Sequence, residues 1–541
     1  MQSSSKQPTA ERSATTSVLS VLTLLESLTL AITLALIIRG FVVEAFVIPT
    51  GSMAQSLLGK HTEIICKNCR YQYTVGTPLK EGTNSVDPDA WGTPLICPNC
   101  QDESVPLTRR HSLIRGGDRV LVLKSAYFLS RYKSLAWLAP KRWDVVVFLY
   151  PGSGLVHYIK RLAGLPGEAL EIIDGDVYID GQIARKTPRA QQQLWIPVFD
   201  NDHQRQRQLQ GWPFWRGASA TVQRFRHGRQ LRLKAKGTES QIEYSGPLSN
   251  ALTYNCLRPF AGQRANATNA TDLRLSFHVI PRDLGPAGEL TAVLSRRNRY
   301  FRLRLVFSET GSPHVELQSG YASPEAEGPI QYRAIRDDKG LALRWELPPT
   351  MIGKSLHLSL QNVDFRVSVC LDGQEVMATT DSSHHSPRSR QARALGLTQA
   401  PRPSVAITAG DCEVDLLHIK LERDVYYTSP SGIYVNRPKD AVEAKLHGTP
   451  PRGVGAPFEM PPSRHNPKPA YFMLGDNSSD SQDSRLWSGK HHGLDETYVR
   501  GTVPRSHMIG QAFFVYWPAA GPIAGKRLPL IPRVGKMRLI H

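Results

Sequence analysis

Ser52 has the setting of a nucleophile in this 541-residue chain. It follows an apolar, β-prone segment, residues 41–48, and the strand-breaking sequence Pro49-Thr50-Gly51. A turn directly after a strand can expose a hydroxyl, and small neighbours leave backbone N–H groups accessible to an oxyanion. A serine hydroxyl is a weak nucleophile, so this reading requires a base close by.

Lys160 is the candidate base. It stands in a β-prone segment, with Tyr158 and Ile159 before it and Leu162 and Ala163 after it. A free lysine titrates near about 10.4, which is too high for a base at neutral pH. Burial against apolar surface can lower that pKa by as much as about 3–5 units. Taken singly, such a serine or lysine is far more often structural than catalytic, so the assignment depends on the features around them.

Two CxxC sequences form a second candidate site. Cys66 and Cys69 are separated by 27 residues from Cys97 and Cys100. Two such knuckles offer four thiolates that can close tetrahedrally on zinc, as in zinc ribbons. We therefore expect a structural zinc site with no part in catalysis. A pair of disulfides is the main alternative, because an extracytoplasmic compartment is oxidising, and a redox CxxC is a third.

Residues 18–38 form an apolar stretch long enough to cross a bilayer as a helix. It exceeds the usual length of a signal-peptide core, and no small-x-small cleavage sequence follows it, so we expect an uncleaved anchor. The formal charge of +19 suits either anionic lipid or nucleic acid. No helix-turn-helix, RNA-binding or P-loop signature accompanies that charge, so nucleic acid is not an expected partner.

The rest of the chain is mostly β in pattern. Short β-prone runs at 119–123, 144–148 and 157–160 are separated by turn sequences, and residues 171–181 predict a hairpin with an Asp-Gly turn. Alternating segments between 215 and 422 predict a sandwich or jelly roll, weakly similar to concanavalin-like or laminin-G-like sandwiches. Cys256, Cys370 and Cys412 in this insert are expected to be free thiols.

Five stretches resemble type I signal peptidases, and they occur in that family's order. The family is a group of membrane-anchored serine proteases with a Ser-Lys dyad. Together the similar regions cover less than half of the chain. The stretches are residues 49–53 (PTGSM), 117–122 (GDRVLV), 140–148 (PKRWDVVVF), 158–168 (YIKRLAGLPGE) and 475–485 (GDNSSDSQDSR).

The resemblance implies the roles at the reaction centre. Ser52 would attack the scissile carbonyl, and Lys160 would take its proton. The Ser52 backbone N–H and the Thr50 hydroxyl would form the oxyanion hole. Ser481 would hydrogen-bond to the Lys160 amine and orient it.

The resemblance also implies the supporting roles. Asp483 and Arg485 would pair to brace the site, and Met53 would line the substrate groove. Two departures from the family pattern concern local geometry. Thr50 stands where Ser is common, and Trp143 stands where Gly usually precedes the aspartate.

The expected function is therefore removal of signal peptides from secretory preproteins after small-x-small motifs, with no cofactor for catalysis. The expected location is the bacterial cytoplasmic (inner) membrane, crossed once, with the N-terminus cytoplasmic and the catalytic domain extracytoplasmic. The lipid bilayer and the protein translocation machinery are the other expected partners. Two alternatives stay open: a membrane-tethered glycan- or peptide-binding protein with a vestigial protease core, and a self-cleaving regulator.

The expected fold is mainly β. A single N-terminal transmembrane helix precedes a signal-peptidase-type, β-barrel-like catalytic core that carries a zinc-ribbon-like insertion and a jelly-roll or concanavalin-like sandwich insertion. The expected division is a disordered tail (1–16), the transmembrane helix (17–39), the first part of the core (40–61 and 106–214), the zinc-ribbon-like insertion (62–105), the sandwich (215–422), a return to the core (423–436), a linker (437–469) and the last part of the core (470–541).

Overall fold

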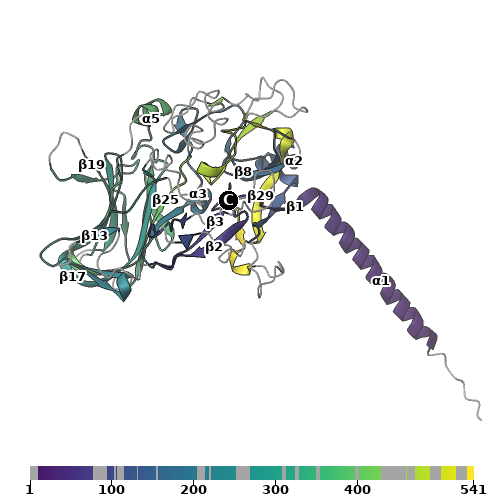
Figure 1. The fold of residues 1–541 in the computed structure, drawn as a ribbon, viewed down its shortest axis with the longest axis horizontal. Coiled ribbons are helices and arrows are strands. Elements are labelled where there is room, and N and C mark those ends of the chain that lie inside the picture. Colours follow the sequence, from purple (N-terminus) through teal and green to yellow (C-terminus); the bar gives the residue numbers. More distant parts are fainter. Residues whose placement is uncertain are drawn as a thin grey trace, which may run out of the picture.

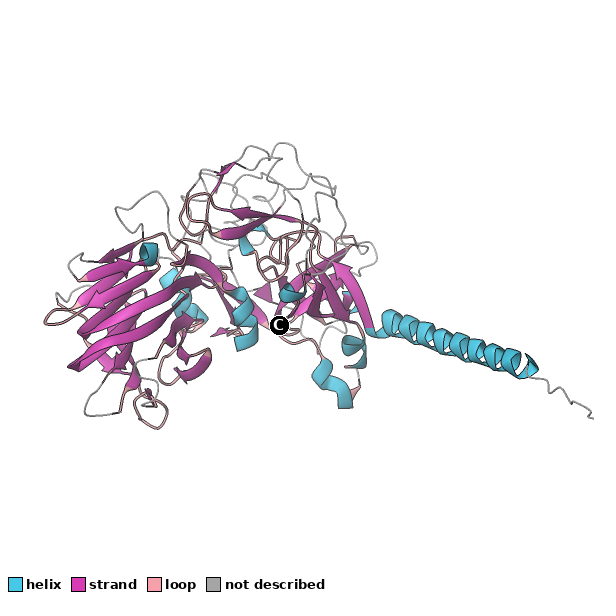
Figure 2. Cartoon of the chain, turned by 90° about the horizontal axis from the view of Figure 1, so that it is seen from below, coloured by secondary structure: helices cyan, strands magenta, loops and turns pink. Residues whose placement is uncertain are grey.

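The computed structural model confirms a mainly β chain with one long N-terminal helix (Figures 1 and 2). The structure describes residues 10–76, 94–102, 105–106, 115–130, 132–153, 156–203, 214–217, 221–250, 269–307, 312–322, 328–348, 354–396, 401–427, 458–459, 469–487, 501–518 and 533–541.

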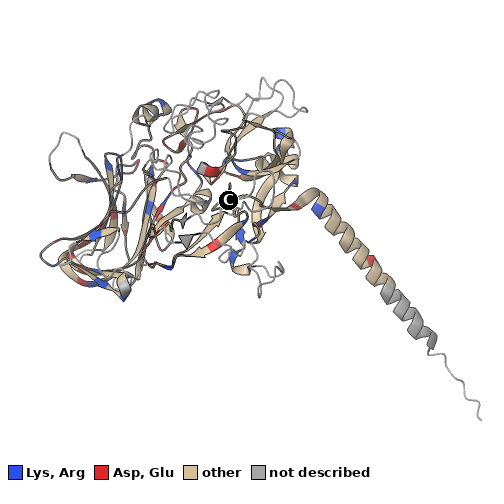
Figure 3. Ribbon diagram, viewed as in Figure 1, with Lys and Arg blue, Asp and Glu red and all other residues tan. Residues whose placement is uncertain are grey.

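Helix α1 (Ala10–Ile37) projects away from the body of the molecule (Figure 1). One turn of π-helix, η1 (Ile38–Val42), joins it to the first strand. The segment Leu22–Val42 is long and apolar enough to cross a membrane by length and composition, and none of it is buried against the rest of the chain. Charged residues are sparse along it (Figure 3). The helix begins before residue 17, so residues 10–16, expected in a disordered tail, are helical.

The part predicted to be the catalytic core contains an antiparallel sheet of eight strands. Its order is β1-β6-β29-β7-β8-β27-β28, with β30 paired to β29. Strands that are distant in sequence thus become neighbours, and β27 near residue 470 pairs with β8, which carries Lys160. The strands are β1 (Val43–Val47), β6 (Arg119–Leu123), β7 (Val145–Leu149), β8 (His157–Gly164), β27 (Ala470–Leu474), β28 (Val503–Pro504), β29 (Met508–Trp517) and β30 (Arg538–Leu539).

A second, four-stranded sheet of order β11-β10-β9-β26 follows the core sheet. The predicted hairpin is present, and its turn at Asp174-Gly175 has positive φ at both residues, as a two-residue hairpin turn requires. The strands are β9 (Ala169–Ile173), β10 (Asp176–Ile179), β11 (Gln182–Ile183) and β26 (Phe458–Glu459). Strand β26 lies inside the predicted linker 437–469, most of which falls outside the described residues.

The cysteine-bearing insertion is built from two short hairpins, β2–β3 and β4–β5. Each CxxC sequence follows one strand of a hairpin, and the four cysteines are buried with Ile64, Tyr73, Val75 and Leu95. The strands are β2 (His61–Ile65), β3 (Gln72–Gly76), β4 (Pro94–Leu95) and β5 (Val105–Pro106).

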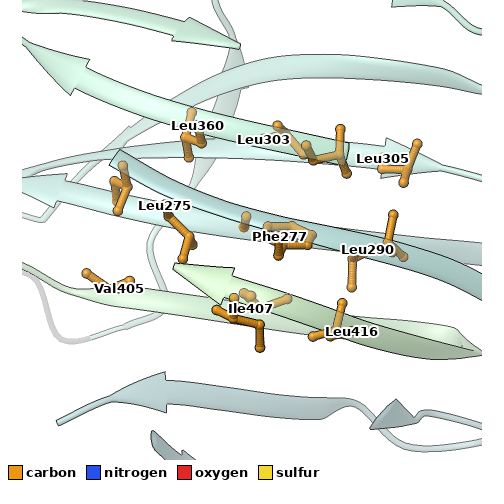
Figure 4. Packing of buried hydrophobic residues seen from close by; sticks show 14 of the residues in the cluster. Leu275, Phe277, Leu290, Leu303, Leu305, Leu360, Val405, Ile407 and Leu416 are labelled. Atoms are coloured by element: carbon orange, nitrogen blue, oxygen red, sulfur yellow. The ribbon is translucent and has the colours of Figure 1, made fainter. Parts of the chain in front are cut away.

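The large β-insert is a 14-stranded sheet that surrounds one apolar core (Figure 4). Strand β17 runs for 24 residues and β25 for 19, and the two pair along most of their length with three bulges. The strands are β12 (Ile196–Asp200), β13 (Trp215–Gly217), β14 (Val222–Phe225), β15 (Gln230–Lys234), β16 (Ser240–Tyr244), β17 (Leu273–Arg296), β18 (Arg299–Val306), β19 (His314–Tyr321), β20 (Tyr332–Ala334), β21 (Arg344–Glu346), β22 (Leu356–Val363), β23 (Arg366–Leu371), β24 (Gln374–Ala378) and β25 (Val405–Arg423).

The β-insert begins earlier than residue 215. Strand β12 pairs with the end of β25, so residues 196–200 belong to the insert's sheet and not to the catalytic core. At the other boundary, Val425 and Tyr427 pack with core residues, as expected for a return to the core; residues 428–436 lie outside the described part. Cys412 is buried, Cys370 is partly buried, and both are free; Cys256 lies outside the described residues.

A buried charge network fixes the β-insert against the second sheet. Lys186 Nζ lies 2.6 Å from Asp364 and 2.7 Å from Asp424, and all three side chains are at most 4% exposed. Arg296 of β17 pairs with Asp176 of β10 at 2.5 Å. Because these pairs join the two parts of the chain away from water, the insert is packed as an integral part of the molecule.

Short helices complete the structure. The α-helices are α2 (Ser125–Leu129), α3 (Pro188–Leu194) and α5 (Ser389–Gly396), and the 3₁₀ turns are η3 (Lys133–Leu138), η4 (Arg226–Gly228), η6 (Ser478–Asp480), η7 (Arg505–His507) and η8 (Val534–Lys536).

Candidate active site

Ser52 lies in a tight turn that several parts of the chain hold in place. The turn is closed by a hydrogen bond from the Ala54 N–H to the Gly51 carbonyl, 3.0 Å long. Gly59 packs directly on this turn, since a Cβ at that position would lie 2.2 Å from the carbonyl carbon of Thr50. The Ser52 N–H donates no hydrogen bond within the described residues, so it is free to bind an oxyanion.

The structure brings the Lys160 amine to the Ser52 hydroxyl. Lys160 Nζ donates a hydrogen bond to Ser52 Oγ, although the two residues are 108 positions apart in the sequence. The lysine is only 4% exposed. Burial lowers its pKa to about 8, against the opposing influence of the Asp483 and Asp476 carboxylates. A buried amine with a lowered pKa, in contact with a serine hydroxyl, is able to accept the proton of that hydroxyl.

Ser481 is buried beside the dyad, but its hydroxyl does not bind Lys160 here. Ser481 Oγ has no hydrogen-bond partner within the described residues. It is nevertheless close to the nucleophile's backbone, because a Cβ on Gly475 would lie 2.0 Å from Ser481 Oγ and 2.7 Å from the Ser52 carbonyl oxygen. Only glycine fits at 475. The expected hydrogen bond between Ser481 and Lys160 is absent within the described residues.

Asp483 and Arg485 form the expected ion pair. Arg485 Nη2 lies 2.6 Å from Asp483 Oδ2, and both side chains are buried. Asp483 also accepts a hydrogen bond from the Gly475 N–H at 2.9 Å, and Arg485 donates to the Ser478 hydroxyl. The pair therefore fixes the loop that carries Ser481.

The structure does not place Met53 in an open groove. Its side chain is completely buried in the apolar cluster that includes Ile48, Leu57 and Val120. The turn directs the residue after Ser52 inward, under the site, so the expectation for Met53 was wrong. Thr50, by contrast, is exposed at the site's surface.

Asn477 holds the nucleophile's turn, a role that sequence reasoning missed. Its backbone N–H donates to the Ser52 carbonyl at 3.0 Å, and its side-chain amide donates to the Gly51 carbonyl at 3.2 Å. The same loop carries Asp476, which pairs with Arg161 through two bonds of 2.7 Å. The only sequence signal for these roles was position: Arg161 follows Lys160 directly, and Asp476 and Asn477 lie within residues 475–485.

Trp143 has a conformation that usually favours glycine. Its φ is +74°, in the left-handed region. The indole is buried, its Nε1 donates to the Arg185 carbonyl at 2.9 Å, and the Lys186 ammonium lies 5.7 Å from the ring centroid. Tryptophan here joins the catalytic core to the segment that leads into the β-insert, and this packing offsets the backbone strain.

The four cysteines of the CxxC sequences form one compact cluster. Their sulfur atoms all lie within 4.8 Å of one another. Cys66 Sγ is 3.6 Å from Cys100 Sγ, and Cys69 Sγ is 3.7 Å from Cys97 Sγ. A tetrahedral zinc ion with Zn–S bonds of about 2.3 Å separates its sulfurs by about 3.8 Å, so the four thiolates fit this ion.

Two kinds of sequence comparison agree on the family. The model of the family "Signal peptidase, peptidase S26" matches residues 21–217 and 433–517, more than half of the chain. Signal peptidase I of Rickettsia typhi is 27% identical over 161 residues, which cover 30% of this chain and 44% of the relative. Signal peptidase I of Rickettsia conorii is 30% identical over 130 residues, 20% of this chain and 48% of the relative. The chain thus spans about half the length of these curated relatives.

Solved structures match part of the chain with low scores. The carbohydrate binding module CBM66 from Bacillus subtilis aligns over 38% of this chain and 94% of its own, with a TM-score of 0.24 and 12% identity. The Ca²⁺/Man₃GlcNAc-bound exoplasmic/lumenal domain of VIP36 aligns over 40% and 90%, with a TM-score of 0.25 and 12% identity. Scores this low assign neither a fold nor a ligand to the β-insert.

The exposed apolar helix and the family match together indicate a membrane-anchored protein. The match ends at residue 217 and resumes at 433, so it excludes nearly all of the β-insert and includes the nucleophile, the lysine and the loop that braces them. By this match, the chain belongs to the signal peptidase family, peptidase S26.

Proposed function

We propose that this protein is a signal peptidase I that cleaves signal peptides from secretory preproteins after small-x-small motifs. The observation that carries the proposal is the hydrogen bond from the buried Lys160 amine to Ser52 Oγ. The alternative of a glycan- or peptide-binding protein with a vestigial core has no comparable support, because the dyad and its bracing ion pair are intact.

The proposed first step is proton transfer within the dyad. With a pKa of about 8, roughly one Lys160 in ten is neutral at pH 7. The neutral amine accepts the proton of Ser52 Oγ as that oxygen attacks the scissile carbonyl carbon. The resulting ammonium then protonates the leaving amine, and an acyl-enzyme on Ser52 remains for hydrolysis by water that Lys160 activates.

The proposed oxyanion hole consists of the Ser52 N–H and the Thr50 hydroxyl. The free Ser52 amide and the exposed position of Thr50 support this assignment. Ser481 becomes important once Ser52 is acylated, because Lys160 then loses its present acceptor. The buried and unpartnered Ser481 hydroxyl is suited to hold the amine in that intermediate.

The proposed membrane arrangement follows from the anchor. Strand β1 starts directly after η1, and Ser52 follows β1 by five residues, so the nucleophile stays close to the bilayer surface. We propose the bacterial cytoplasmic membrane, an N-terminus in the cytoplasm and a catalytic domain outside. Signal peptides emerging from the translocation machinery would then reach the site along the membrane.

We further propose that Cys66, Cys69, Cys97 and Cys100 hold a structural zinc ion. The sulfur separations support this over two disulfides, which need S–S bonds of about 2.05 Å. All four cysteines are at most 2% exposed, so no open coordination position faces solvent. The ion would stabilise the insertion, and the chemistry of cleavage would not involve it.

A cleavage assay tests the proposed function. Purified full-length protein in detergent should cleave a preprotein carrying a small-x-small site, whereas Ser52→Ala and Lys160→Ala should not. Ser56→Ala is a matched control, because Ser56 lies in the same segment and its hydroxyl donates to the Gln193 carbonyl instead. Equal cleavage by the wild-type protein and both dyad variants would refute the proposal.

A further inference from the structure

Three histidines meet on the β-insert, outside the catalytic core. His278 lies on β17, His357 on β22 and His418 on β25, and β17 pairs with both of the other strands. His278 and His357 are direct cross-strand partners, with ring centroids 4.7 Å apart. The His418 ring is 5.2 Å from that of His278.

The three imidazoles share the solvent-facing side of the sheet. The neighbours of His278, Phe277 and Val279, are completely buried in the apolar core, so alternation places His278 on the opposite face. His278 and His357 are half-buried, and His418 is exposed. Dissolved ions can therefore reach all three rings.

A bulge places the third histidine in this group. The pairing of β17 with β25 shifts between Ser276 and His278, where β25 contains one extra residue. His418 has a φ of +51°, a left-handed conformation that is unfavourable for a non-glycine residue. Bulges re-aim side chains, and strained residues of this kind cluster at functional sites.

Hydrogen bonds to the Nδ1 atoms leave the other ring nitrogens available. His418 Nδ1 lies 2.7 Å from the Asp202 carboxylate, and His278 Nδ1 lies 3.2 Å from the Ser355 hydroxyl. Within the described residues, no hydrogen bond involves Nε2 of any of the three histidines. A carboxylate on the far nitrogen is the usual support of a metal-binding histidine, because it fixes the tautomer and the ring orientation.

We propose that His278, His357 and His418 form a surface site for a divalent transition-metal ion, with Asp202 orienting His418. Imidazole nitrogen is a preferred ligand of Zn²⁺, Ni²⁺ and Cu²⁺, and three such ligands leave a coordination position open. The rings of His278 and His357 are stacked at 21°, and the ring nitrogens of the three histidines do not all lie within 4.8 Å of one another. Binding therefore turns these rings about their side-chain bonds, a rapid motion for solvent-accessible side chains.

This site is independent of the tetracysteine cluster and of the dyad. It shares no ligand with either, and its failure would leave the proposed function untouched. The two metal sites differ in chemistry as well, since one offers four buried thiolates and the other offers accessible imidazoles. Their metal contents can therefore be separated by substitution.

Zinc counting on the full-length protein in detergent tests the proposal. After equilibrium dialysis against a series of free Zn²⁺ concentrations, the wild-type protein should bind one ion more per chain than His278→Ala or His357→Ala. Asp202→Asn should keep the site but weaken it about 10–100-fold. His314→Ala, on β19 of the same sheet, is the matched control and should bind as the wild-type protein does.

The zinc dependence of the melting temperature provides a second readout. Added Zn²⁺ should raise the melting temperature of the wild-type protein and of His314→Ala, but should raise that of His418→Ala less. Cys66→Ser should lose the zinc ion of the tetracysteine cluster and keep the ion bound by the three histidines. Equal zinc content and equal zinc-dependent stabilisation in the wild-type protein and all three histidine variants would overturn the proposal.

Discussion

Replacing Lys160 with methionine should stabilise the protein at pH 7 while it abolishes cleavage. Burial lowers the lysine pKa from its ordinary 10.5 to about 8 in the folded state. Each pH unit between the two values corresponds to about 1.4 kcal/mol, so keeping this amine in the folded site costs about 3 kcal/mol at pH 7. Methionine has a similar length and carries no charge, so Lys160→Met removes that cost.

The pH dependence of this stabilisation has a definite sign. The folded pKa is below the unfolded value, so the unfolded state binds more protons and the wild-type protein gains stability as the pH rises from 8 to 10.5. The advantage of Lys160→Met should therefore decrease from about 3 kcal/mol at pH 7 to less than about 1 kcal/mol at pH 10.5.

Urea unfolding followed by tryptophan fluorescence at both pH values measures this difference. Lys141→Met, at an exposed lysine before β7, is the control and should change the free energy of unfolding by less than about 0.5 kcal/mol. A Lys160→Met protein that is less stable than the wild type at pH 7, or whose advantage is the same at both pH values, would refute the reasoning.

Three further predictions concern the parts around the dyad. Asp483→Asn leaves Arg485 buried without its partner and should cost about 3–5 kcal/mol of stability, measured by urea unfolding, with Asp483→Glu as the conservative control. Asn477→Ala removes the amide that holds the Gly51 carbonyl and should lower kcat/KM about tenfold without moving its pH profile; an unchanged rate would contradict this role. Cys97→Ser should lose one zinc ion per chain in a metal analysis, and an unchanged zinc content would exclude the tetracysteine site.

The hydrogen bond between Lys160 and Ser52 agrees with the pairing expected from the sequence, where each residue lies in recognisable local structure. Ser52 follows a strand and a breaker, and Lys160 lies in a short β-prone run that the structure confirms as β8. Their proximity could not be read from local pattern, because it depends on the pairing order of the sheet. The expectation that Ser52 and Lys160 meet came only from the resemblance of five separated stretches to one family.

The strands of the core were also predictable. The predicted runs at 119–123, 144–148 and 157–160 correspond to strands β6, β7 and β8, and the Asp174-Gly175 turn has the positive φ values expected for a tight hairpin. Alternating apolar residues or short apolar runs between turn residues give a strong signal for such elements.

Other features could not be read from local pattern. Strand β17 contains Pro281, Gly285 and Pro286, which normally end a strand, and bulges against β25 accommodate them. Strand β12 is five residues long, contains Pro197, and is defined by pairing with a segment more than 200 positions away. The orientation of Met53 depends on how the turn after β1 packs, which the residue types do not specify.

The pH dependence of kcat/KM for preprotein cleavage tests the central claim most directly. The account predicts that kcat/KM rises about tenfold per pH unit below pH 8 and levels off above it, because the reactive form contains neutral Lys160. A profile that is flat between pH 6 and pH 9, or an unchanged profile in Lys160→Ala, would contradict it.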